Sequence, residues 1–143
     1  MNQIIVLLIV IAMHFGLNES CPDHRVVITN QLGKGRALQY RCTGSHDGSN
    51  TGIRTLAKFN QSYQFLFRDW PTSWTDEQNR SRFVCDLSWG PQNENRADNI
   101  EVYRAAMNRR CGLLRQYIAR EDGFYYRSAY NVPVGWVRGW TKK

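Results

Sequence analysis

The sequence predicts an all-β fold: a small, disulfide-bonded antiparallel β-sandwich of about eight short strands, preceded by a cleaved N-terminal signal peptide. Apolar and polar residues alternate with a period of two along much of the chain, whereas helical periodicity is almost absent. Turn-forming residues recur about every 8–12 positions, which is typical of β-sandwiches and small barrels. Four cysteines are the number needed for two disulfides in an exported chain.

The N-terminus has the pattern of a secretory signal peptide. Residues 4–13 form an unbroken run of ten apolar residues. A membrane-spanning helix needs about 20 such residues, so this run is too short to span and has the length of a signal's apolar region. Cleavage is expected after Ser20, with Gly16 as the alternative; a buried N-terminal strand or helix is the competing interpretation. We therefore expect a secreted, extracellular protein.

Length and composition indicate one folded domain over residues 21–143, with a basic C-terminal tail. The chain has 143 residues, 42% of them hydrophobic and 22% charged, which is typical of a globular domain and not of a disordered chain. The formal net charge is +7. Removing the signal would delete one acidic residue, Glu19, and no basic one.

Strands are expected in the first half of the domain wherever β-branched or alternating apolar residues lie between turn residues. Residues 25–30 are rich in β-branched residues and end before a Gly-Lys-Gly turn, and residues 38–42 alternate as in a half-buried strand. A weaker strand is expected at 52–58. Tyr63, Phe65 and Phe67 alternate again, which predicts a strand at 63–67.

The second half contains four further expected strands, at residues 83–89, 101–106, 111–120 and 124–127. Residues 111–120 are ambiguous, because their apolar residues also fit helical spacing. The Gly112 near the start and the Asp122-Gly123 turn just beyond favour a strand leading into a hairpin. The polar segment 90–99 is expected to be a loop.

All the cysteines lie beyond the expected cleavage site: Cys21, Cys42, Cys85 and Cys111. In an oxidising compartment they are expected to form two disulfides. Four cysteines allow three pairings, and the sequence leaves all three open. Positions in the middle of strands, on apolar faces, favour a bond between Cys42 and Cys85.

Two tripeptides satisfy the acceptor pattern for N-glycosylation, at Asn60 and Asn79. Both lie at expected strand boundaries of an exported chain, so we expect a glycoprotein. A third match, at Asn18, would leave with the signal.

The sequence contains no motif that indicates catalysis. The close pair His46 and Asp47 lies in a Gly/Ser-rich loop, where a solvated turn is favoured over a general base. Nucleophile-elbow, zinc-protease and phosphate-binding patterns are absent from the sequence. Without a C-x-x-C pair, and with only His24 and His46 left after cleavage, a zinc site is not expected either. We expect no enzyme activity, cofactor or metal.

The sequence contains more features suited to binding than to catalysis. Trp70 and Trp74 flank a proline in a polar loop, and such aromatic residues could stack on sugars or anchor a protein contact. Packing over a sheet edge is the alternative role. Residues 123–143 carry four basic side chains and no acidic one, a pattern that attracts acidic polysaccharide or a membrane surface, unless it is simply a solvated face. Nucleic acid and stable membrane insertion are not expected for this exported chain.

Five blocks in fixed order resemble the plant self-incompatibility S-protein homologue family over residues 21–126. The most specific of them is DGFY at 122–125. The blocks are VVITNQL (26–32), LQYRC (38–42), FLFR (65–68), FVC (83–85) and AREDGFY (119–125).

This resemblance implies a small secreted plant β-sandwich that acts as a signalling ligand recognised by a cell-surface receptor, in pollen rejection or another cell-to-cell signal. The founding members are pistil ligands recognised by a pollen receptor, which leads to calcium entry and arrest of the pollen tube. A carbohydrate-binding or cell-wall-binding module and a secreted defence protein are the alternatives. Receptor contacts are expected in three loops, 44–50, 69–79 and 90–99, with His46, Asp47, Trp70 and Trp74 as candidate contact residues.

Overall fold

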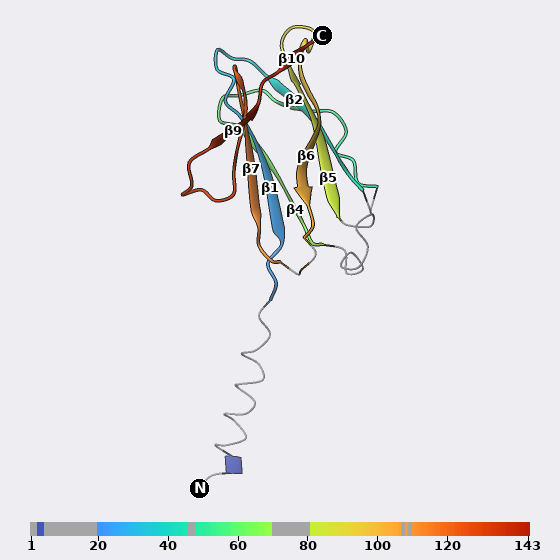
Figure 1. Ribbon diagram of the computed structural model, residues 1–143, viewed down its shortest axis with the longest axis vertical. Helices are drawn as coiled ribbons and strands as arrows, with labels where there is room; N and C mark the ends of the chain where they lie inside the picture. The colour runs from blue at the N-terminus through green and yellow to red at the C-terminus, as the bar shows by residue number, and fades with distance from the viewer. Residues whose placement is uncertain (1–2, 5–19, 46–47, 70–80, 107, 109) are drawn as a thin grey trace.

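The computed structural model describes residues 3–4, 20–45, 48–69, 81–106, 108 and 110–143. In this part of the chain, ten strands form two five-stranded sheets packed face to face (Figure 1). No helix of the described residues is long and apolar enough to cross a membrane. The strands are β1 His24–Asn30, β2 Leu38–Gly44, β3 Arg54–Leu56, β4 Ser62–Phe67, β5 Arg82–Trp89, β6 Asn95–Arg104, β7 Leu114–Arg120, β8 Gly123–Arg127, β9 Gly135–Arg138 and β10 Thr141–Lys142.

The all-β sandwich predicted from the sequence is confirmed, with one parallel strand pair. The first sheet has the order β4-β1-β7-β8-β9 and the second has the order β10-β6-β5-β2-β3. Neighbouring strands are antiparallel except β1 and β7, which run in the same direction. The chain between these two strands passes through the second sheet, so no hairpin sets their relative direction. The ambiguous segment 111–120 contains a strand, β7.

The hydrophobic core lies between the sheets and is built from the alternating residues of the predicted strands. Val26 and Ile28 of β1 and Phe124 of β8 are each at most 1% exposed. They belong to one buried cluster with Leu38 of β2 and Leu87 of β5 from the second sheet. Burial of these side chains supplies most of the favourable free energy of folding.

Both disulfides form in the pairing that strand positions favoured. Cys42 and Cys85 are directly opposed on β2 and β5, and their bond lies within the core. Cys21 and Cys111 are joined at the surface, where they tie the segment before β1 to the segment before β7. No cysteine among them remains free.

The expected loop at residues 90–99 is wrong in its second half. β6 already begins at Asn95, and Ala97 is fully buried against the core. The alternation is hidden in the sequence because the pairing of β5 with β6 shifts register twice, and Asn99 has a left-handed backbone with φ of 56°. Only the short turn 90–94 remains as a loop.

The C-terminal residues are not a simple basic tail, because they add β9 and β10 to the two sheets. Trp140, between these strands, is half-buried against the core, and its indole N–H donates to the carbonyl of Arg120 at 2.7 Å. Trp136 on β9 is 60% exposed. The strands were missed because each is short and lacks a buried alternating stripe.

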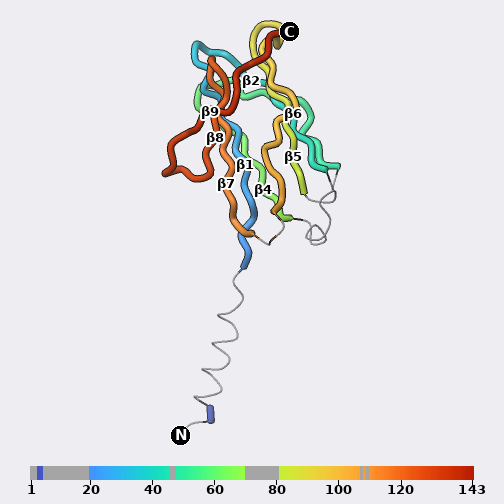
Figure 2. Tube along the Cα trace, in the orientation of Figure 1, coloured from blue at the N-terminus to red at the C-terminus, as the bar shows by residue number. Residues whose placement is uncertain are grey.

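The sandwich has two distinct ends (Figures 1 and 2). β2 ends and β5 begins at one of them, where Gly44 is opposite Phe83. We call this the loop end, because the β2–β3, β4–β5 and β6–β7 connections all leave from it. At the opposite end, Leu38 is opposite Trp89, and the chain makes the β1–β2, β3–β4, β5–β6 and β7–β8 turns.

Candidate recognition site

Backbone hydrogen bonds tie neighbouring connections together at the loop end. The N–H of Ser45 donates to the carbonyl of Arg82 at 2.9 Å, and the N–H of Ala105 donates to the carbonyl of Ser81 at 2.8 Å. The β2–β3 and β6–β7 connections are therefore each fastened to the start of β5. The described residues that flank two of the three loops expected to contact a receptor, 44–50 and 69–79, lie at this end, whereas the 90–94 turn lies at the opposite end.

The four candidate contact residues lie outside the described residues: His46, Asp47, Trp70 and Trp74. Their contact role stays a prediction. The described residues that flank them nevertheless fix where both segments leave the sandwich.

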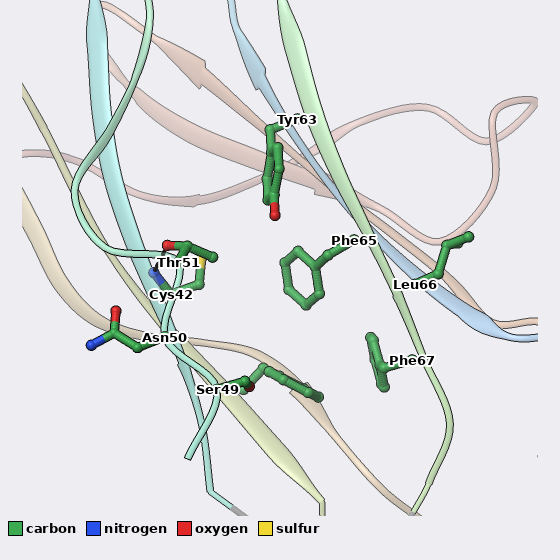
Figure 3. Close-up of a pocket in the computed structure, with 9 residues that line it drawn as sticks. Cys42, Ser49, Asn50, Thr51, Tyr63, Phe65, Leu66 and Phe67 are labelled. Carbon is green, nitrogen blue, oxygen red and sulfur yellow. Dashed lines mark hydrogen bonds between the residues drawn. The ribbon is translucent and has the colours of Figure 1, made fainter. Parts of the chain in front are cut away.

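An aromatic groove opens beside these loops, with a volume of about 290 Å³ (Figure 3). The side chains of Tyr63, Phe65 and Phe67 point from β4 across the groove toward residues 49–51, whereas Leu66 points away. Phe83 of β5 also lines the groove, with its ring centre 4.5 Å from that of Phe67. The complete lining is Cys42, Ser49, Asn50, Thr51, Tyr63, Phe65, Leu66, Phe67 and Phe83.

The groove exists because the edge strand of the second sheet is too short to cover the edge strand of the first along its whole length. β4 is the edge strand of the first sheet, and the edge strand of the second, β3, has only three residues. The inward-facing aromatic residues of β4 are consequently half-buried where central strands would bury them completely. The alternation at 63–67 was visible in the sequence, but the edge position of the strand was not.

The far wall of the groove is held firmly against β2. Thr51 Oγ1 accepts the N–H of Cys42 at 3.0 Å, and the N–H of Thr51 donates to the Cys42 carbonyl at 3.0 Å. Asn50 Oδ1 accepts the N–H of Gly52 at 2.8 Å, which fixes the following turn. The groove is therefore formed in advance of any contact with a partner.

A partly buried polar network holds Asp69, just after the end of β4. His24 Nδ1 accepts the N–H of Leu113 at 3.2 Å, so in the neutral imidazole Nε2 carries the proton and donates to Asp69 Oδ2, also at 3.2 Å. The hydroxyl of Tyr103 donates to Asp69 Oδ1 at 2.6 Å. Burial, reinforced by the Asp69 carboxylate, raises the pKa of Tyr103 well above its usual value, so this hydroxyl stays protonated.

The hydrogen bonds from His24 and Tyr103 fix the position of Asp69, two residues after the end of β4. Sequence reasoning missed all three members of this network, because His24, Asp69 and Tyr103 are far apart in the chain. Both ring nitrogens of His24 are occupied by these partners, so the histidine is positioned as a structural group. The described residues contain no cluster of three His, Cys, Asp or Glu side chains that could hold a metal ion.

The glycosylation candidates lie in different situations. Asn60 is exposed in the β3–β4 turn at the opposite end, with a left-handed φ of 63°. Its Oδ1 accepts a hydrogen bond from Gln31 Nε2 at 3.0 Å. Asn79 lies outside the described residues. Modification of either residue stays a prediction.

Comparisons with known proteins agree with the fold. The family model of plant self-incompatibility protein S1 matches residues 25–140. S-protein homolog 25 of Arabidopsis thaliana is 37% identical, with 99% of each chain covered, and S-protein homolog 30 of the same plant is 35% identical over 90% of this chain and 95% of its own. The chain belongs to the plant self-incompatibility protein S1 family, as the sequence blocks predicted.

A solved structure has the same fold. It represents SPH (self-incompatibility protein homologue) proteins, described as a widespread family of small, highly stable, secreted proteins from plants. The match has a TM-score of 0.57 at 23% sequence identity and covers 86% of this chain and 98% of that one. At this identity the likeness supports the two-sheet architecture only.

Proposed function

We propose that this protein is a secreted plant signalling ligand of the S-protein homologue type, recognised by a cell-surface receptor and without catalysis of its own. Family membership supports this role, as does the apolar N-terminal run that would direct export. The observation that carries the proposal is the loop end: two polar loops leave a disulfide-bonded sandwich beside a preformed aromatic groove.

The recognition surface is narrower than the three loops expected from the sequence. Residues 44–50 and 69–79 are both flanked by described residues of the loop end, so the two segments could contact one partner together. Residues 95–99 belong to β6, and the 90–94 turn lies at the other end of the molecule, so we omit this third loop from the surface.

The groove would supply the apolar centre of such a contact. Binding energy at protein interfaces concentrates in a few side chains that fill desolvated pockets, surrounded by polar contacts. A large apolar side chain of the receptor entering this groove would meet the rings of Phe65 and Phe67 on one wall and Thr51 on the other. Because both walls are preformed, little conformational entropy would be lost on binding.

The first experiment applies purified, oxidised protein to pollen tubes, roots and other plant cells while cytosolic calcium is recorded. We expect a calcium rise in at least one cell type, and we expect reduction of the disulfides to abolish it. Calcium that stays at baseline in every cell type would refute the signalling role.

The second experiment tests the groove with neighbouring residues of one edge strand. Phe65→Ala removes a ring that points into the groove (Figure 3), whereas Gln64→Ala shortens the neighbouring exposed side chain, which is not part of the groove lining. We expect Phe65→Ala to weaken the calcium response and Gln64→Ala to leave it unchanged, with thermal unfolding confirming that both variants are folded at the assay temperature. Equal responses from two folded variants would exclude the groove from recognition.

A further inference from the structure

A basic groove lies at the opposite end of the sandwich, between the edge strands of the two sheets. It has a volume of about 560 Å³ and contains four cationic side chains and one carboxylate. Its lining is Arg96, Asp98, Arg138, Thr141, Lys142 and Lys143. Figures 1 and 2 show the C-terminus at this end of the sandwich.

The segment that carries these cations is fixed in place. Trp140 lies between β9 and β10. Its ring packs edge-on against Trp89, with 6.1 Å between the ring centres, and also packs against Phe124, with 6.0 Å between the ring centres. The N–H of Lys143 donates to the carbonyl of Glu94 at 2.9 Å. The backbone that carries the cations is therefore held in one position, which lowers the entropic cost of binding a ligand.

The internal partners of the cations leave much of their charge available. Arg96 Nη2 lies 3.1 Å from Asp98 Oδ1, and Arg138 Nη2 donates to the carbonyl of Asp98 at 3.1 Å. Within the described part of the chain, neither Lys142 nor Lys143 makes an ion pair within 4.0 Å. Both lysines are exposed.

We infer that the basic groove binds an acidic polysaccharide whose repeating sugar carboxylates pair with Lys142, Lys143 and Arg138. The Asp98 carboxylate, held by Arg96, is placed to accept hydrogen bonds from sugar hydroxyls. A hollow lined only by polar and charged side chains suits a hydrated sugar chain better than a bilayer, because surface binding to membranes also uses inserted apolar side chains.

The basic groove and the loop end are at opposite ends, so a polysaccharide and a receptor could be bound together. This inference does not depend on the receptor role. Binding through the basic groove would retain the protein in an acidic extracellular matrix while its loop end stays exposed.

The test is titration calorimetry of the full folded protein at low salt with three probes. These are an oligogalacturonate, the same oligomer with its carboxylates methyl-esterified, and vesicles containing phosphatidylserine. We expect binding of the oligogalacturonate that added salt weakens, and no binding of the neutral ester. Absence of binding to the acidic oligomer, or tighter binding to the vesicles, would overturn the inference.

Charge-matched variants separate the groove from general attraction by a basic protein. Lys142→Gln with Lys143→Gln removes two groove cations, and Arg25→Gln with Lys58→Gln removes two exposed cations elsewhere. We expect the first pair to weaken oligogalacturonate binding about tenfold and the second to change it by less than about twofold. Equal weakening by both pairs would show net-charge attraction and contradict a site in the groove.

Discussion

The imidazole of His24 and the carboxylate of Asp69 lie 3.2 Å apart, and this contact ties the start of β1 to the residues that follow β4. Tyr103 of β6 supplies a second hydrogen bond to the same carboxylate. The partly buried carboxylate of Asp69 thus joins three strands from two sheets at the loop end and fixes where the chain leaves β4.

Tyr103→Phe should destabilise the protein by about 1–2 kcal/mol, because it removes a donor from a carboxylate that is largely shielded from water. Tyr125 provides a matched control, since its hydroxyl donates to Asp122 at the same distance, 2.6 Å, but at the surface. Tyr125→Phe should change stability by less than about 0.5 kcal/mol. Equal losses of stability for both variants in urea unfolding would contradict a stabilising role for the network.

Stability should fall at alkaline pH. Burial raises the pKa values of Tyr40 and Tyr117 from 10.0 to about 12. Because these pKa values are higher in the folded protein than in the unfolded chain, their stabilising contribution is complete below pH 10 and is lost as the pH rises through 12. Denaturant midpoints measured across this window should decrease, and Tyr117→Phe should make the decrease shallower. Ionisation of every tyrosine near pH 10 in a folded protein would contradict this expectation.

Loss of either disulfide should cost about 2–4 kcal/mol, with the core disulfide costing more. The Cys21–Cys111 bond spans 90 residues and the Cys42–Cys85 bond spans 43, a doubling that favours the first by only about 0.6 kcal/mol. Cys42 and Cys85 are at most 3% exposed, so alanine at both positions also leaves a cavity. In urea unfolding, the variant with alanine at Cys42 and Cys85 should have a lower free energy of unfolding than the variant with alanine at Cys21 and Cys111. The reverse order would contradict this expectation.

Asn60 should carry a glycan when the protein passes through a plant secretory pathway, because its side chain is exposed in a turn and Ser62 completes the acceptor pattern. A mass shift that endoglycosidase removes would show the modification. Asn60→Asp preserves a residue type that tolerates the left-handed backbone, and Ser62→Ala keeps Asn60 itself. Both variants should lose the same mass; a shift that persists in both would place the glycan elsewhere.

The strands that the sequence predicted best are those with one clearly buried face. β2 buries every second side chain from Leu38 to Cys42, and β5 does so from Cys85 to Leu87. β6 was predicted too short, because its N-terminal half is polar and irregular in register, although Ala97 faces the core. β9 and β10 depend on pairing with distant strands, so local patterns could not reveal them.

The candidate site was predictable only in part. Loop composition indicated residues 44–50 and 69–79, but the sequence could not show that these share an end while the 90–94 turn does not. The aromatic groove depends on which strands lie at sheet edges, and the network of His24, Asp69 and Tyr103 joins residues up to 79 positions apart. Both are products of long-range topology.

The most direct test of the recognition surface is saturable binding of labelled protein to responsive cells, in competition with unlabelled variants. One variant replaces the four contact residues predicted at the loop end with alanine: His46, Asp47, Trp70 and Trp74. The control carries Lys58→Ala and Gln92→Ala in exposed turns at the opposite end. We predict that the control competes as well as the unchanged protein and that the loop-end variant, shown to be folded by thermal unfolding, does not. Full competition by the loop-end variant would contradict recognition through this end of the sandwich.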